Sequence, residues 1–556
     1  MTRLKLPALI ACLMLAGLSV ACPSGERANH PTPPKPATGG SSAAPAVAGG
    51  ILRLPLEIEV NDPLLKQLDF SDQRLFALAR CLAVPLVRAG TSGELMPGLA
   101  ESWELEDDGA EWRFILRTAP GHEAEPAYLG EVWIEHLREL LRSGPPALKA
   151  QVADLIGGAV GFRAGKARDI DGVTLDGSKL TIKLTRAHTQ LPLWLSQPGL
   201  GVMLSNDGTK TLGPFTFSHS NGNELVLAAN PQALDGPPLL YEVHFLCGLE
   251  REEQLDLFRT GQLECANLPL AALATIQDDP ALAGQQLALP STAMILGMFD
   301  LHQFPWGDGP FQSKQGLREA LNWGLDREYI QEALNDQIEA WPHFLPPAFS
   351  EYIPPELLQQ PRYPLGTEIE RARRALKEAD HEQGSHLLPG MDLGFPAYEH
   401  LDALAVEVLE FWEEISVKMR PFPMTDQELA ERVDKGTHEI ILRKAYPAYP
   451  SPDALFYPLL YSALNGLGGN WSLLDDDEVD ALITASQATA DEVSRKKLYR
   501  DLSNELEQRA LLVFIGSDTP TILISNELAG LSLSPYDFDA SLAGQDFAKL
   551  GFKAAQ

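Results

Sequence analysis

The stretch GELMPGLAESWELEDDGAEWRFILR, Gly93–Arg117, carries the clearest structural signal in the chain. Large apolar side chains recur at every second position on both sides of the dipeptide Asp108-Gly109: Trp103, Leu105, Trp112, Phe114 and Leu116. An Asp-Gly pair between two such alternating runs is typical of a tight β-hairpin. We therefore predict two antiparallel strands here, each with one apolar face directed toward a core.

The strand pattern continues through the first half of the chain, and helices dominate the second half. Alternation recurs near residues 180–184 and 223–230, and from Tyr241 the segments YEVHFL, EREEQLDLFRTG and QLECANL predict strand, helix and strand. Helical stripes of apolar residues follow in the segments 316–334, 401–415 and 491–506. Strand character returns at LLVFIG and TILIS. This order predicts an α/β chain of at least two lobes, in which the C-terminal segment completes the strand-rich first part.

The N-terminus has the layout of an export signal. Arg3 and Lys5 precede a nearly all-apolar run from Leu6 to Val20, and small residues follow. The run is too short to span a bilayer, which takes ~20 residues. Its ending, LSVAC, resembles a bacterial lipobox, which makes residues 1–22 a lipoprotein signal peptide and Cys22 the lipidation site. Cys12 fits the local pattern better but leaves too short an apolar region before it, and simple cleavage to a soluble secreted form is the alternative.

Residues 23–50 are rich in Pro, Gly, Ser and Ala and contain almost no large apolar side chain. Such a segment cannot bury enough surface to offset its ordering entropy, so we expect a flexible tether. Three cysteines, Cys81, Cys247 and Cys265, follow the signal, which is too few for a disulfide framework in a chain of this size. Cys247 and Cys265 flank one predicted helix, and they either pair or remain as buried thiols.

Charge and missing motifs exclude several classes of function. The chain has 44 Lys and Arg against 76 Asp and Glu, so its own field opposes binding of nucleic acid. His-Glu-x-x-His and Gly-x-Ser-x-Gly do not occur, and GFRAGKARD lacks the spacing and hydroxyl residue of a phosphate loop. No residue is nominated as catalytic or as a metal ligand. We therefore expect a protein that is not an enzyme and needs no cofactor.

The order of several segments is similar to that of a known family. The stretch Gly93–Arg117, then GGAVGFRAGKARDIDGV, LGPFTF, REALNWGLDREYI and DDEVDALITAS resemble successive signatures of the bacterial extracellular solute-binding proteins, family 5. These are the binding subunits of oligopeptide-, dipeptide- and nickel-type ABC importers. Each match is modest alone, but their order is specific and spans nearly the whole mature chain.

The resemblance implies an α/β fold of the large, class II periplasmic-binding-protein type, with two lobes, a hinge and an interlobe cleft. Lobe I would comprise residues 51–243 and 519–556 with an extra subdomain, and lobe II residues 244–518. The implied function is that of a lipid-anchored, monomeric, extracytoplasmic protein, in the periplasm or at the cell surface. It would capture a short peptide or related small solute and deliver it to a permease and ATPase complex. A degenerate member that acts as a sensory or scaffold lipoprotein, or that binds a non-peptide ligand, is the alternative.

The resemblance also points to the segment AYPAYPSPDALF, Ala445–Phe456, as a wall of the cleft. The candidate ligand-binding residues in and around it are Arg443, Tyr446, Tyr449, Asn470 and Trp471. Peptide-binding members hold an aspartate in this segment that pairs with the α-ammonium group of the peptide, and here Ala448 takes its place. A buried ammonium needs a paired charge. Either Glu439 or Asp453 would have to substitute, or Arg443 and Lys444 would favour a carboxylate ligand instead.

Overall fold

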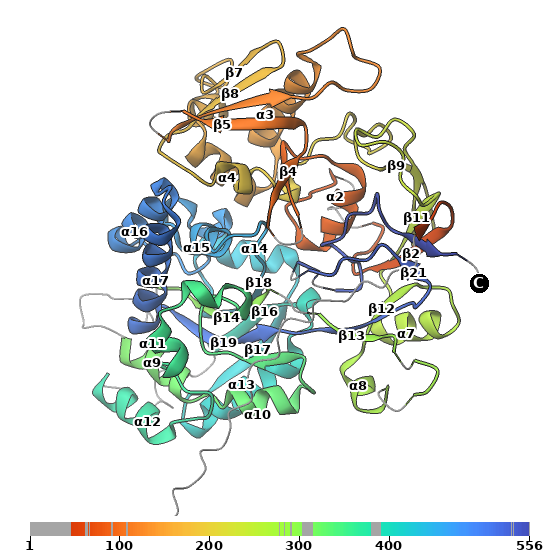
Figure 1. Ribbon diagram of the computed structural model, residues 1–556. Coiled ribbons are helices and arrows are strands. Elements are labelled where there is room, and N and C mark those ends of the chain that lie inside the picture. The colour runs from red at the N-terminus through yellow and green to blue at the C-terminus, as the bar shows by residue number, and fades with distance from the viewer. Residues whose placement is uncertain are drawn as a thin grey trace, which may run out of the picture. The chain divides into compact units, whose positions relative to one another are not determined.

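In the computed structural model of the protein, the residues described are 46–554 except 62–64, 66, 91–92, 107–108, 277–278, 283, 290–291, 303–314, 380–390, 535 and 538, and except the side chains of 274 and 275. All of them belong to one compact unit, residues 42–556 (Figure 1). The signal peptide, Cys22 and most of the expected tether lie outside the described residues. The last residues of the expected tether do not: β1 (Ala46–Val47) pairs with β22 (Gly551–Lys553), so the chain already joins a sheet at Ala46.

The hairpin predicted at the start is present. Strands β5 (Ala100–Leu105) and β6 (Glu111–Leu116) pair antiparallel, with Trp103 opposite Phe114. Strands β8 (Lys179–Lys183) and β7 (Val173–Asp176) extend this sheet to four strands. Helices α3 (Tyr128–Ser143), α4 (Pro146–Leu155) and α5 (Ala159–Arg163) accompany it. A Cβ atom on Gly130 of α3 would lie 2.4 Å from Leu175 and 2.9 Å from Leu116, so the glycine lets this helix approach the sheet closely.

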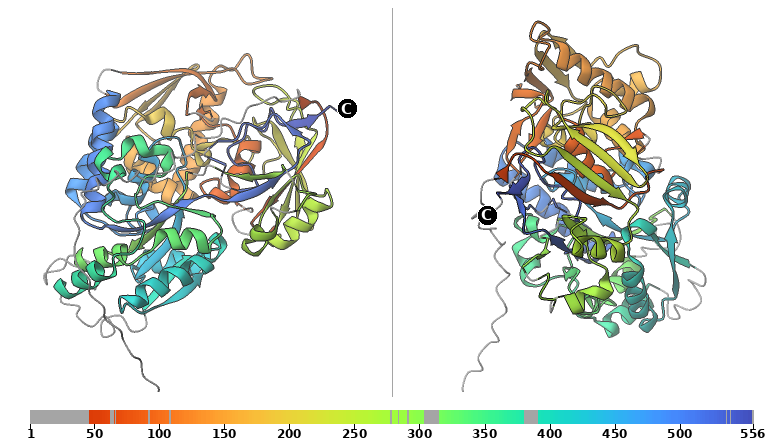
Figure 2. Two further views of the ribbon diagram at one scale, coloured as in Figure 1. Left: turned by 60° about the horizontal axis from the view of Figure 1, so that its bottom comes forward. Right: turned by 90° about the vertical axis from the view of Figure 1, so that its right-hand side faces the viewer.

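A second sheet combines strands from both sides of the hairpin region. Its order is β2-β11-β10-β9, with bounds Ile51–Leu56, Glu242–Cys247, Glu224–Ala229 and Phe215–Asn221. It faces the viewer in the right-hand view of Figure 2. The predicted strand-helix-strand unit is confirmed as β11, α7 (Arg251–Arg259) and β12 (Cys265–Asn267). A small sheet β12-β20-β13 follows, with β20 at Thr521–Ile524 and β13 at Gln286–Ala288.

The shorter elements of this half fill the space around these sheets. They are β3 (Val87–Ala89), β4 (Leu95–Pro97), β21 (Leu528–Ala529), α2 (Phe76–Leu82), α6 (Leu191–Trp194) and α8 (Leu270–Ile276). The C-terminal strand β22 lies between β1 and β21, so the end of the chain returns to the first half as expected. The three cysteines Cys81, Cys247 and Cys265 are all buried and free, which excludes a Cys247–Cys265 disulfide in this structure.

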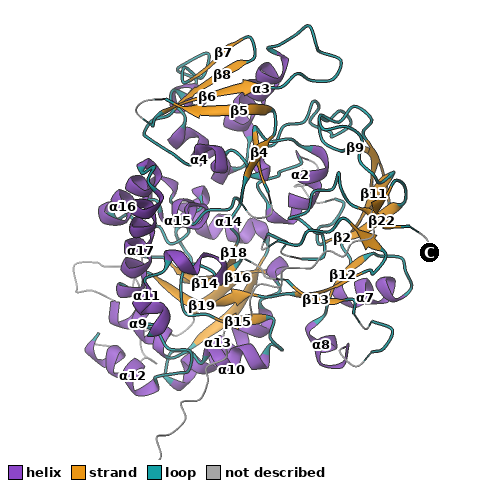
Figure 3. Ribbon diagram, viewed as in Figure 1, coloured by secondary structure: helices purple, strands orange, loops and turns teal. Residues whose placement is uncertain are grey.

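The second half is built on a six-stranded sheet with the order β15-β19-β14-β18-β16-β17 (Figure 3). Its strands are Ile338–Ala340, Leu512–Asp518, Met294–Phe299, Ile440–Ala445, Met391–Pro396 and Met419–Met424. The described helices around it are α9 (Gln315–Trp323), α10 (Arg327–Ala333), α11 (Pro355–Gln359), α12 (Ile369–Glu378), α13 (Asp402–Glu414), α14 (Asp426–Lys435), α15 (Asp453–Leu460), α16 (Asp477–Ala488) and α17 (Glu492–Gln508). The stripe expected as one helix over 316–334 is two helices, because the chain breaks at Gly324 and Asp326 caps α10 by accepting from the Tyr329 amide.

The sheets divide the chain at two links. The chain leaves the first group of sheets after β13 and returns between β19 and β20, where only Thr519 and Pro520 separate the strands. The expected boundary between residues 243 and 244 falls inside β11, which pairs with both β2 and β10. We therefore propose that residues 244–288 belong to the first lobe and that the second lobe spans residues 293–518. Across the described residues, no helix has the length and apolar character needed to cross a membrane.

Candidate functional site

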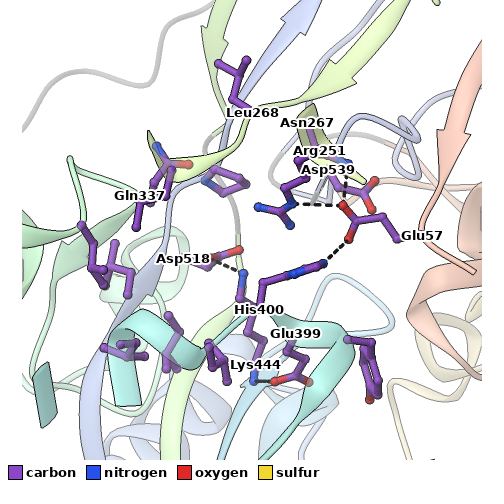
Figure 4. A pocket seen from close by; sticks show the side chains of 18 of the residues that line it. Glu57, Arg251, Asn267, Leu268, Gln337, Glu399, His400, Lys444, Asp518 and Asp539 are labelled. Atoms are coloured by element: carbon purple, nitrogen blue, oxygen red, sulfur yellow. Dashed lines mark hydrogen bonds and ion pairs between the residues drawn. The ribbon is translucent and has the colours of Figure 1, made fainter. Parts of the chain in front are cut away.

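A cavity lies between the two groups of sheets, with about 1090 Å³ of empty space that is partly open to solvent. Its polar lining comes from both sides: Glu57, Arg251 and Asn267 from the first lobe, and His400, Lys444 and Asp518 from the second (Figure 4). Pro520 of the link between β19 and β20 also lines it. We call this the larger cavity. A site with walls on two lobes joined by short links changes shape when the lobes move.

Glu57 is the centre of the polar group on the first-lobe wall. It follows directly after β2 and accepts hydrogen bonds from Arg251 Nε at 3.2 Å and from Asn267 Nδ2 at 3.1 Å. His400 Nε2, from the second lobe, lies 3.4 Å from the other carboxylate oxygen. Burial raises the pKa of Glu57, but Arg251 and His400 outweigh it and hold the pKa at about 2. Glu57 therefore stays ionised, and its contact with His400 joins the two walls.

Lys444 and Asp518 face the cavity from neighbouring parts of the six-stranded sheet. Lys444 Nζ lies 2.9 Å from Asp518 Oδ1, while the second carboxylate oxygen of Asp518 is buried without a hydrogen bond. The backbone amide of Lys444 donates to Glu399 Oε2 at 2.6 Å. Burial raises the pKa of Glu399 to about 7, against the opposing attraction of Arg443 and Lys444. The second-lobe wall therefore holds one satisfied ion pair and a carboxyl group that is protonated more readily than usual.

Asp539, in the C-terminal segment of the first lobe, adds a further carboxyl group to the lining. Burial and the negative charge of Glu57 raise its pKa, and hydrogen bonds from Ser541 oppose this effect. Within the described residues no basic side chain forms an ion pair with Asp539. The larger cavity therefore contains a carboxyl group that a cationic group of a ligand can neutralise.

A second contact between the lobes lies at the rim of the larger cavity. Arg74, in the short helix Gln73–Leu75, donates to Asp72 at 2.9 Å and to Asp426 of the second lobe at 2.9 Å. Its guanidinium carbon lies 3.9 Å from the ring centroid of Tyr398, also of the second lobe. Arg74 therefore binds both an acid and an aromatic face across the cleft.

A smaller cavity continues the cleft on the far side of the segment 444–450. It has about 370 Å³ of empty space, partly open to solvent, and its lining includes Arg80, Ala448, Tyr449 and Tyr536. Ala543 lines both cavities. The irregular segment between β18 and α15 is thus a wall of both, with Tyr446 on the larger and Ala448 on the smaller.

The structure separates the five residues proposed from the sequence. Tyr446 lines the larger cavity, and Tyr449 lines the smaller one, where its hydroxyl donates to Asp453 at 2.9 Å. Arg443 stacks on Trp471, with its guanidinium carbon 3.8 Å from the ring centroid, and neither residue lines either cavity. Asn470 is fully buried and its amide binds backbone and side-chain oxygens of its own loop. Only the two tyrosines therefore face the cleft.

The acids considered as substitutes for an aspartate at 448 do not face the larger cavity. Asp453 is fully buried and accepts from Tyr449 and Gln487. Glu439 lies 3.9 Å from Arg432 and is absent from the lining of both cavities. Of the two basic candidates, Lys444 faces the larger cavity but is already paired with Asp518.

The cleft residues that sequence reasoning missed come from distant segments: Glu57, Arg251, Glu399, His400, Asp518 and Asp539. None belongs to a local motif, because apart from the neighbours Glu399 and His400 each is brought to the cavity by a different segment. The one available signal is position, since Glu57 and Asp518 stand at the ends of strongly apolar runs that form β2 and β19. The described residues contain no group of three or more His, Cys, Asp or Glu side chains that could hold a metal ion.

Two lobes on either side of a polar cavity, joined by short links, define a two-lobed solute-binding protein. Residues 131–466, more than half of the chain, match the sequence profile of the bacterial extracellular solute-binding proteins, family 5 middle region. The chain therefore belongs to this family of extracytoplasmic binding proteins.

Relatives and solved structures agree with this assignment. The chain is 23% identical to a probable di/tripeptide-binding protein 5 of Pseudomonas aeruginosa over 83% of this chain and 88% of that protein. It is 22% identical to the nickel-binding periplasmic protein of Escherichia coli over 81% and 86%. The structure of the murein tripeptide-binding protein MppA of Escherichia coli superposes with a TM-score of 0.73 at 19% identity, over 92% of this chain and all of that one. These comparisons establish the two-lobed periplasmic peptide-binding-protein fold.

Proposed function

We propose that this protein is the lipid-anchored substrate-binding subunit of an ABC importer. It captures a short peptide or related small solute between its lobes and delivers it, unchanged, to a membrane permease. The observation that carries this proposal is the larger cavity, whose charged groups come from both lobes and meet at Glu57 and His400. A solute that fills such a cavity contacts both lobes at once and favours the closed form, which the permease can recognise.

We further propose that Asp539 binds the ammonium group of a peptide. Ala448 cannot supply a charge, and the substitutes considered from the sequence do not face the larger cavity. Asp539 does face it and forms no ion pair among the described side chains, although the positive charge of Arg251 attracts it. An ammonium group beside it would offset the cost of burying the carboxylate.

The first experiment is to purify the chain without residues 1–22 and to identify co-purifying small molecules by mass spectrometry. Titration with pools of di- and tripeptides, followed by thermal unfolding, then tests the peptide class directly. We expect a bound peptide or amino-acid-derived solute, and a rise in Tm that grows with ligand concentration. If no pool changes the Tm and no solute co-purifies, a transport role has no support and the sensory or scaffold role becomes the better hypothesis.

The role of Asp539 is tested with Asp539→Asn and with peptides whose N-termini are free or acetylated. We expect wild type to prefer the free ammonium by about tenfold or more, and the variant to lose this preference. Asp546→Asn is the matched control, because this half-exposed aspartate of the same segment pairs with Lys549 outside the cavity. A preference that survives in Asp539→Asn would assign the ammonium to another acid.

A further inference from the structure

Arg80 is a basic side chain of the cleft without a partner. It lies in the last turn of α2 and lines the smaller cavity. Its Nε atom is buried and makes no hydrogen bond, and no ion pair or hydrogen bond of its terminal nitrogens occurs among the described residues. The other basic side chains of the cleft wall differ: Arg74, Arg251 and Lys444 each have an acidic partner.

The acid that attracts Arg80 most strongly is Asp537, which is already hydrogen-bonded elsewhere. Asp537 accepts from the Ser534 amide at 2.9 Å, from Gln545 Nε2 at 2.7 Å and from the Gly544 amide at 2.9 Å. These bonds hold the C-terminal segment in place, so Asp537 has little capacity left for Arg80. Burial lowers the pKa of Arg80, and the attraction of Asp537 only partly opposes this. A guanidinium whose Nε atom is buried without a hydrogen bond is costly, and proteins retain such a group where something else completes it.

The rest of the smaller cavity suits an anionic group. Arg80 is the only charged side chain among its described lining residues. Ser196 and Tyr449 already use their hydroxyl protons, on Leu193 O and Asp453, whereas Tyr536 has no hydroxyl hydrogen bond among the described residues. Ala448 faces the cavity with a methyl group, and no acidic side chain is among the described lining residues. The unused donors at this end of the cleft are therefore the guanidinium and one phenol.

We propose that Arg80 binds a carboxylate group of the transported solute, in the smaller cavity beside Ala448. The inference rests on the proposed function, since it places one end of the solute in the same cleft. The planar guanidinium offers two parallel N–H donors that match the two oxygens of a carboxylate. A short peptide would then lie along the segment 444–450 with its C-terminus at Arg80 and its ammonium group toward Asp539. The residue that gives the cleft this polarity belongs to α2, far in sequence from the 444–450 wall.

The test compares carboxylates with matched neutral analogues on the mature chain, residues 23–556. Di- and tripeptides with free or amidated C-termini, and succinate with succinamide, are titrated into wild type, Arg80→Gln and Arg80→Lys by calorimetry and thermal unfolding. We expect wild type to bind the acids at least about tenfold more tightly than the amides. Arg80→Gln should abolish this ratio, and Arg80→Lys should keep only part of it because an ammonium lacks the paired donors. Arg138→Gln changes a partly exposed arginine that pairs with Asp169, and it should keep the ratio in full.

Each outcome decides one of the two proposals. If acids and amides bind wild type equally well, or if Arg80→Gln retains the ratio, the assignment of Arg80 is wrong while the solute-binding function stands. If no peptide binds in either form, the peptide function fails, and succinate then decides the role of Arg80. Stabilisation by succinate that is lost in Arg80→Gln supports the carboxylate site, and no stabilisation overturns it. Arg80→Gln should itself fold, because Arg80 is only partly buried and has no ion pair to lose among the described residues.

Discussion

Lys444 and Asp518 form an ion pair whose two side chains are 16% and 4% exposed, and it faces the larger cavity. Lys444→Met leaves Asp518 buried without a counter-charge, since its second oxygen already lacks a hydrogen bond. We expect the free energy of unfolding to fall by about 2 kcal/mol or more, measured by urea denaturation at pH 7. Lys435→Met is the control: its pair with Glu431 is exposed, and its loss should cost less than about 1 kcal/mol. Equal losses in both variants would contradict the buried-pair account.

Glu399 gives the cleft a pH dependence of known sign. Its pKa is raised from 4.5 to about 7, so the folded state binds a proton more tightly than the unfolded state. The associated stability is present below pH 4.5 and is lost as the pH rises through 7. Glu399→Gln keeps an acceptor for the Lys444 amide and removes this loss.

The measurement is the unfolding free energy of wild type and Glu399→Gln at pH 5 and pH 8. From pH 5 to pH 8, the unfolding free energy of wild type should fall by about 2–3 kcal/mol relative to that of Glu399→Gln. A difference that does not change with pH would show that Glu399 titrates normally in the folded protein. Glu413→Gln, on the exposed end of α13, should show no such change.

At the scale of elements, the loop between α15 and α16 depends on Asn470. Its amide donates to Asn465 Oδ1 at 2.7 Å and to Leu474 O at 3.0 Å, and its oxygen accepts from the Leu474 amide at 3.2 Å. The neighbouring Gly469 has φ +128°, and a Cβ there would lie 2.5 Å from Pro458 O. The loop conformation therefore depends on both residues: Asn470 supplies its hydrogen bonds, and Gly469 allows its positive φ and close approach to Pro458.

Asn470→Ala separates a structural role from a ligand-binding role. We expect a loss of about 2–3 kcal/mol in unfolding free energy, because several buried polar groups lose their partner, and an unchanged Kd for the solute. Tyr446→Ala should weaken the solute affinity, since Tyr446 lines the larger cavity, and it also costs stability because the ring packs against the first-lobe core. Asn221→Ala, at an exposed strand end, is the neutral control. A weaker solute affinity in Asn470→Ala at unchanged stability would restore the role first proposed for this residue.

The elements show how far the sequence alone leads. Alternation around Asp108-Gly109 predicted β5 and β6, because this signal is local. The break at Gly324 was missed, since the apolar stripe continues through it although the backbone turns. The charged lining of the cavity was missed for a related reason: Glu57, His400 and Asp539 become neighbours only when β2, the start of α13 and the C-terminal segment are assembled. Periodicity reports which face of an element is buried, but not which distant element covers it.

At the scale of the whole molecule, two of the described contacts between the lobes lie at the larger cavity, while others join Asp154 and Thr189 of the first lobe to α15 and α16. Arg74 reaches Asp426 at the start of α14, and Glu57 reaches His400 before α13. Both pairs join element ends on opposite walls of the cleft, so widening of the cleft separates them. The balance between open and closed forms should therefore respond to single charges at the rim.

Asp426→Arg tests this balance, because it places a second guanidinium beside Arg74. We expect the variant to populate more of the open form, seen as a larger radius of gyration in small-angle X-ray scattering and as weaker solute binding with unchanged stoichiometry. Asp434→Arg makes the same charge change at an exposed position of the same helix. Its radius of gyration and its solute affinity should equal those of wild type. Saturating solute should return the radius of gyration of Asp426→Arg to the compact value. The bound solute contacts both lobes, and these contacts do not depend on the ion pair that the variant has lost. A radius that stays the same in Asp426→Arg would show that Arg74 does not influence closure.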